Sequence, residues 1–141
     1  MLRLKTTAAT VTGAAGGLVA GWMGGIDQLL YSLLVFMAID IVTGWLAAAV
    51  FKTSFNTETG RLCSMVGFRG LVKKGCMLLM IIVAVQLDGL LSTSSLTRDA
   101  VVIAFLANEL LSILENMGAM GIRLPDAIVN ALELLNRRKS E

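Results

Sequence analysis

Hydrophobic residues gather in four stretches of the chain, and short polar connections separate these stretches. The stretches cover residues 8–25, 29–51, 75–91 and 100–118. At a rise of 1.5 Å per residue, even the shortest reaches about 25 Å, which approaches the thickness of about 30 Å of a bilayer's hydrocarbon core. The pattern predicts an all-α integral membrane protein with about four transmembrane helices.

The last of these stretches carries its polar residues on one face. At about 100° per residue, five side chains fall within an arc of roughly 120°: Asn108, Glu109, Ser112, Glu115 and Asn116. Carboxylates inside a membrane are costly and usually face other helices or water. We therefore expect this stripe to line a pore or to contact helices in an assembly. The alternative is a protein with three spans, in which this segment lies at the membrane surface as an amphipathic helix.

The second stretch is the clearest span, and its one charge is Asp40, near the middle. Asp40 shares a helix face with small residues: Thr43, Gly44, Ala47 and Ala48. A carboxylate in the middle of a bilayer costs about 2.5 to 3.5 kcal/mol unless it is paired, hydrated or protonated. We expect Gly44 to allow close helix packing, and Asp40 to be either a packing carboxyl or a pore or assembly residue. Asp88 is expected at the outer interface and is a further candidate for a pore-lining or assembly residue.

Glycine recurs at every fourth position of the first stretch, at Gly13, Gly17, Gly21 and Gly25. A helix face without side chains lets another backbone approach closely, so the repeat predicts a helix-packing face. Two alternatives remain open for this stretch. Glycine lowers helix propensity, so the segment could be weakly helical, and it could also be a signal peptide.

A basic connection, residues 52–74, is the longest loop that the pattern predicts. Its basic residues are Lys52, Arg61, Arg69, Lys73 and Lys74, and its single acidic residue is Glu58. Such a loop belongs on the cytoplasmic side of the membrane. We expect Arg61, Arg69, Lys73 and Lys74 to bind anionic lipid headgroups. Nucleic-acid binding is the weaker alternative, because the basic residues have few aromatic partners and belong to no recognisable module.

Beyond the fourth stretch, Pro125 begins a short amphipathic helix over residues 125–137. Its apolar stripe consists of Ile128, Ala131, Leu132 and Leu135, and it is expected to lie at the interface or to self-associate. With four spans, the N-terminus, the basic loop and this tail share one side and hold all basic residues except Arg98. The positive-inside rule then places both termini in the cytoplasm.

Composition agrees with this picture and excludes most enzyme classes. Of the 141 residues, 56% are hydrophobic and 16% are charged, against about 25% charged in soluble domains. The mean hydropathy is +0.79, so we expect one membrane domain over residues 1–141. Histidine is absent, which excludes Ser-His-Asp catalysis and the usual zinc and haem ligands. Cys63 and Cys76 are expected to be free thiols. The sequence predicts no catalytic residue, metal or cofactor, and an enzyme with a Ser/Lys pair is the weakest alternative.

Several motifs together resemble the toxin secretion/phage lysis holins. The second stretch contributes LVFMAIDIVTGWLAA, and the basic connection contributes the run from Ser64 to Lys74. VAVQLD ends at Asp88, and the most specific motif is ANELLSILENMGAMGIRLPDAI, which contains the polar stripe, Gly121 and Pro125. The resemblance covers roughly 100 residues, and the glycine-rich first stretch contributes least to it.

The resemblance implies a holin, which accumulates in the bacterial inner membrane and then assembles into lesions. Homo-oligomers and membrane lipid would be its partners. An endolysin, or a toxin in some relatives, would leave through the lesions without necessary direct contact. The alternative function is a small ion or proton channel or a secondary transporter subunit, in which Asp40 or Glu109 binds protons or cations.

Overall fold

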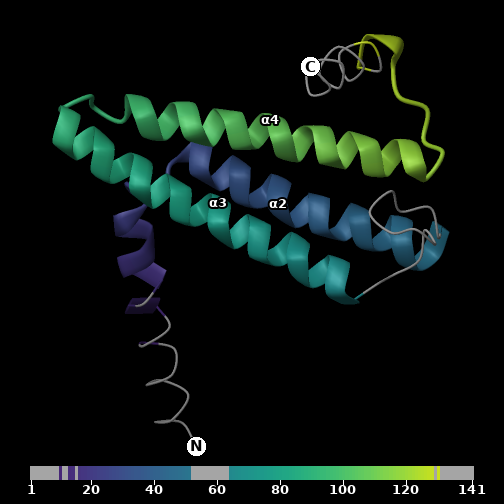
Figure 1. The fold of residues 1–141 in the computed structure, drawn as a ribbon, viewed down its shortest axis with the longest axis horizontal. Coiled ribbons are helices and arrows are strands. Elements are labelled where there is room, and N and C mark those ends of the chain that lie inside the picture. The colour runs from purple at the N-terminus through teal and green to yellow at the C-terminus, as the bar shows by residue number, and fades with distance from the viewer. Residues whose placement is uncertain (1–9, 11–12, 15, 52–63, 129, 131–141) are drawn as a thin grey trace, which may run out of the picture.

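Three long helices lie side by side in the computed structural model (Figure 1). α2 runs from Gln28 to Leu46 and continues as a short π-helix, η1, over Ala47–Phe51. α3 spans Ser64–Leu91, and α4 spans Leu96–Ala119. The structure describes residues 10, 13–14, 16–51, 64–128 and 130.

Each of the three helices is long and apolar enough to cross a membrane. The candidate spans are Gln28–Phe51, Met65–Leu91 and Leu96–Ala119. The prediction of an all-helical membrane protein is therefore confirmed, and the segment with the polar stripe is one of the candidate spans. The expected span over residues 8–25 is not among the three. Its described part is helical over 16–22 and leaves the bundle crosswise (Figure 1).

The first helical segment ends at two glycines, and this corrects the expected role of one of them. Gly24 and Gly25 have φ values of 82° and 90°, in the left-handed region where glycine carries no Cβ penalty. The Gly25 amide donates to the Ala20 carbonyl at 2.9 Å, and the Gly24 amide donates to Gly21 at 3.1 Å. This pair of bonds is a Schellman motif, which terminates a helix. Gly25 therefore belongs to the turn before α2 and not to a helix-packing face.

α3 begins eleven residues before the span expected at residue 75, so the basic connection is shorter than predicted. Residues 64–74 are helical, because charged residues end a hydrophobic pattern without breaking a helix. The 28 residues of α3 extend about 42 Å, more than a bilayer core of about 30 Å requires. Arg61 and Cys63 lie outside the described residues.

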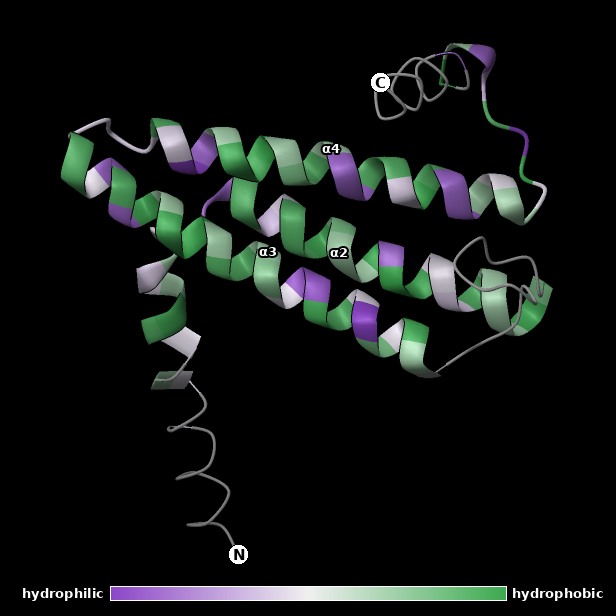
Figure 2. Ribbon diagram, in the orientation of Figure 1, coloured by the Kyte–Doolittle hydropathy of each residue, from purple (hydrophilic) through white to green (hydrophobic). Residues whose placement is uncertain are grey.

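Most of the interior of the bundle is apolar, and so is most of its outer surface. α4 packs against both α2 and α3. The core includes Leu30 and Leu33 from α2, Met77 and Ile81 from α3, and Val102 from α4. Large apolar side chains cover the outside as well, and Figure 2 shows hydrophobic residues along most of each helix. A surface of this kind suits lipid as the surrounding solvent.

Small residues of α2 and η1 are buried on the face that carries Asp40. Thr43, Ala47 and Ala48 are all buried. The Thr43 hydroxyl donates to the Asp40 carbonyl at 3.1 Å, so its polar group is satisfied within the helix. These small residues therefore lie on the side of the helix that is covered within the bundle.

A tight turn joins α3 to α4, and Asp88 holds it together. The Asp88 carboxylate accepts hydrogen bonds from the amides of Thr97, at 2.9 Å, and Arg98, at 2.8 Å. The Thr93 hydroxyl donates to the same carboxylate at 2.5 Å. Asp88 thus caps the first turn of α4 from the preceding helix, which stabilises free helical amides. This capping offsets the strain of three turn serines with positive φ: Ser92, Ser94 and Ser95.

α4 ends at another Schellman motif. Gly121 has a φ of 80°, its amide donates to Gly118 at 3.0 Å, and the Ile122 amide donates to Met117 at 3.1 Å. After Pro125 the chain is helical at residues 126–128 and 130. The remainder of the predicted tail helix lies outside the described residues.

Candidate functional site

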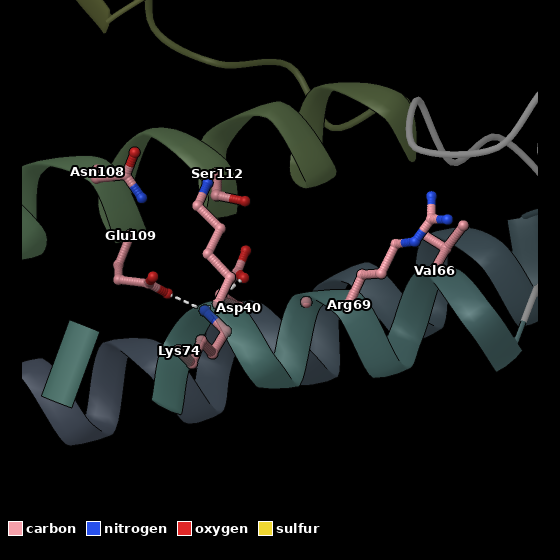
Figure 3. A pocket seen from close by; sticks show the side chains of 9 residues that line it. Asp40, Val66, Arg69, Lys74, Asn108, Glu109 and Ser112 are labelled. Carbon is pink, nitrogen blue, oxygen red and sulfur yellow. Dashed lines mark hydrogen bonds and ion pairs between the residues drawn. The ribbon is translucent and has the colours of Figure 1, made fainter. Parts of the chain in front are cut away.

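Three charged side chains, one from each long helix, meet inside the bundle. Lys74 of α3 lies between Asp40 of α2 and Glu109 of α4, and we call these residues the charged triad. The Lys74 Nζ is 2.9 Å from Asp40 Oδ2 and forms a second ion pair with Glu109 Oε2. Figure 3 shows the Lys74 and Glu109 side chains pointing toward one another. The exposed fractions of the Lys74, Asp40 and Glu109 side chains are 11%, 15% and 3%.

An amide extends the triad toward the end of α4. Asn116 Nδ2 donates to Asp40 Oδ1 at 3.0 Å and to Thr43 Oγ1 at 3.2 Å. Gly44 lies beside this amide, since a Cβ there would be in van der Waals contact with Asn116 Nδ2 at 3.4 Å. The role of Gly44 in helix packing stays a prediction, based on the way small residues let membrane helices approach.

The triad has one more acid than base. Two ionised carboxylates and one ammonium sum to a charge of about −1, and a buried net charge is costly in a low dielectric. The hydrogen bond from Asn116 stabilises the Asp40 carboxylate, whereas Glu109 depends on Lys74 among the described contacts. Removal of Lys74 would leave two like charges without a counter-ion. The triad therefore holds the three helices in one arrangement.

A pocket of about 360 Å³ lies beside the triad, between α3 and α4. Besides the triad, its lining comprises Val66, Arg69, Gly70 and Lys73 from α3 and Asn108 and Ser112 from α4. Arg69 and Lys73 are exposed. Figure 3 shows Arg69 extending from α3 toward α4. The pocket thus has carboxylates at its inner wall and free basic groups at its rim.

The structure separates the polar stripe of α4 into three environments. Glu109 and Asn116 are buried, with exposed fractions of 2% and 8%, and they face α2 and α3. Asn108 and Ser112 are half-buried at the pocket. Glu115 is exposed on the outside of the helix. The stripe therefore meets other helices within one chain, and Glu115 alone is open to a neighbour.

The structure places Lys74 differently from the sequence prediction. We expected it among the headgroup-binding residues, but it is only 9% exposed and paired with two carboxylates. Its position one residue after Lys73 turns it by about 100° on the helix, toward the bundle. The signal that could have revealed the pairing is the presence of two carboxyls on other spans that lacked a partner, since buried charges in membranes pair with one another.

A second polar cluster, around Arg98, lies at the end of the bundle where α2 and α4 begin, and it was not predicted. Arg98 is 4% exposed. Its guanidinium donates to the carbonyls of Met23, at 3.0 Å, and Gly25, at 3.2 Å. It also pairs with Asp27, at 2.5 Å, and with Asp99, at 2.9 Å. Arg98 therefore fastens the turn before α2 to the start of α4.

Asp27 caps α2 and is stabilised in its ionised form. Its carboxylate accepts a hydrogen bond from the Leu30 amide at 2.9 Å. The hydrogen bonds from Arg98, followed by the bond from the Leu30 amide, lower the pKa of Asp27 to about 2. A depressed pKa of this kind means that folding favours the charged carboxylate. Gly24 contributes by its missing side chain, since a Cβ there would lie 3.1 Å from Arg98 Nε.

Comparison with known proteins identifies the family of this chain. Residues 17–137 match the bacteriophage holin family. The chain belongs to the bacteriophage holin family. This match includes the triad, the pocket and the Arg98 cluster. Membership explains the absence of a catalytic centre in the sequence, because holins are non-enzymatic membrane proteins.

Individual relatives extend over most of the chain. A probable holin of Bacillus phage phi105 is 32% identical over 123 residues, which cover 85% of each protein. An uncharacterized protein from the nagH 3′ region of Clostridium perfringens is 38% identical over 125 residues, or 87% of this chain and 89% of the relative. An uncharacterized protein of Listeria monocytogenes is 36% identical over 126 residues, or 89% and 84%. No solved structure matches this chain.

Proposed function

We propose that this chain is a holin that oligomerises in the bacterial cytoplasmic membrane and forms lesions through which an endolysin, or a toxin, is released. The family match supports this function. The observation that carries the mechanism is the charged triad inside a bundle whose outer surface is apolar. Because its charges are satisfied within one chain, the protein can accumulate in lipid without exposing them.

Lesion formation then requires the same side chains to exchange partners. In an assembly, the polar face of α4 can turn away from α2 and α3 and toward water. Water can replace the ion pair because hydration and pairing stabilise a carboxylate to a similar degree. The excess carboxylate of the triad favours this exchange, since hydration relieves its net charge. The triad therefore stabilises the harmless bundle, and its polar groups line the assembled lesion.

The basic residues support an orientation. The loop over 52–63 and the tail after α4 lie on the same side in the three-span arrangement and carry six of the twelve basic residues. The positive-inside rule places this side in the cytoplasm. A cytoplasmic N-terminus requires the first stretch to cross the membrane as well, and this stays a prediction.

Expression in a bacterium together with a reporter endolysin tests the function. We expect a delay, followed by an abrupt loss of membrane potential and release of the endolysin. Asp40→Asn and Glu109→Gln each reduce the charge that holds the bundle, and both should shift the time of onset at matched membrane levels. Sustained high expression with the potential intact would refute a holin. A graded cation current without endolysin release would favour the channel alternative.

A further inference from the structure

The pocket between α3 and α4 has features of a binding site that the triad does not use. Arg69 and Lys73 form no ion pair with any other described residue, although they line the same pocket as two carboxylates. Both carboxylates are already bound to Lys74. The two free cations therefore remain at the rim, where they can bind an anion.

Arg69 and Lys73 lie on the half of α3 that follows the basic loop. From Ser64, where α3 begins, to Arg69 the helix rises about 8 Å. Both side chains are exposed. Long basic side chains of a membrane helix extend toward the nearer interface, where the phosphates of lipids lie.

We propose that this pocket binds the headgroup of an anionic phospholipid, with Arg69 and Lys73 holding its phosphate. Arginine and lysine are the side chains that recognise phosphate in proteins. Asn108 and Ser112 line the same pocket from α4 and supply hydrogen-bonding groups for the hydroxyls of a glycerol headgroup. A lipid held in this way contacts α3 and α4 together and stabilises their arrangement around the triad. The proposal rests on the chain lying in a membrane and not on lesion formation.

Counting bound lipids on the purified full-length protein tests the proposal. Native mass spectrometry is performed after reconstitution with dioleoyl phosphatidylglycerol or with dioleoyl phosphatidylcholine. Phosphatidylglycerol should be retained preferentially. Arg69→Gln and Lys73→Gln should each weaken its retention about fivefold, the effect of one basic residue near an anionic surface. Arg123→Gln removes an exposed basic residue outside the pocket and should leave retention unchanged.

Two glycines of α3 provide a test that changes no charge. Gly70 lines the pocket and Gly67 does not, and neither has a neighbour within 4 Å of an added Cβ. Gly70→Leu should fill the pocket and reduce retention, whereas Gly67→Leu should not. Equal losses in Arg69→Gln and Arg123→Gln, equal effects of the two leucines, or no preference for phosphatidylglycerol would each overturn the proposal. Equally tight binding of soluble glycerol phosphate would overturn the assignment to lipid.

Discussion

Lys74 should contribute more to the stability of the bundle than either of its partners. Lys74→Met retains an unbranched chain but leaves Asp40 and Glu109 as two buried carboxylates without a counter-ion. Removing one member of a buried ion pair typically costs 3 to 5 kcal/mol. Glu109→Gln instead leaves the Lys74–Asp40 pair at 2.9 Å and replaces a charge-assisted hydrogen bond with a neutral one, which costs about 1 kcal/mol. We therefore expect a gap of at least about 2 kcal/mol between the two variants.

The double variant Lys74→Met/Glu109→Gln tests the role of charge pairing more directly than either single variant. Adding Glu109→Gln to Lys74→Met removes one of two uncompensated like charges, so it should recover part of the stability that Lys74→Met loses. Unfolding by SDS titration in mixed micelles, followed by circular dichroism, measures all three variants. A double variant less stable than Lys74→Met alone, or single variants with equal losses, would show that the triad does not hold the bundle by charge pairing.

Three other predictions address assembly, the Arg98 cluster and acid stability. Gly17 has no neighbour within 4 Å of an added Cβ, so Gly17→Leu should leave monomer stability unchanged but reduce crosslinked oligomers and shift the onset of lysis. Arg98→Gln should lower the free energy of unfolding by about 1 to 3 kcal/mol in the SDS titration, because the carbonyls of Met23 and Gly25 lose their donor. The Asp27 pKa of about 2 lies below the ordinary 3.8, so its stabilising effect is complete above pH 3.8 and disappears as the pH falls through 2. Asp27→Asn should flatten the dependence of stability on pH in that window.

Each of these predictions has an outcome that contradicts it. Unchanged crosslinking in Gly17→Leu would make the glycine repeat incidental to assembly. A loss below about 1 kcal/mol in Arg98→Gln would mean that water replaces the guanidinium at little cost. Equal pH profiles for the Asp27→Asn variant and the parent chain would show that the pairing with Arg98 does not depend on the charge of Asp27.

The sequence determined the features that depend on local periodicity. The three long apolar helices follow from runs of hydrophobic residues, and the buried face of α2 follows from small residues at helical spacing around Asp40. Pro125 marked where the helix after α4 begins. The start of α3, among the basic residues, was the least predictable boundary. The hydrophobic pattern ends where the charged residues begin, but charged residues are compatible with a helix, so the helix continues through them.

Tertiary structure decided which polar groups meet. Lys74 and Glu109 are 35 positions apart, and Arg98 and Asp27 are 71 apart. Whether such residues touch depends on the axial stagger and rotation of neighbouring helices, which the pattern within one helix does not fix. Packing set that stagger through the apolar core and through Gly44 beside Asn116. It brought Lys74 between two carboxylates, because in lipid an unpaired charge has no water to stabilise it.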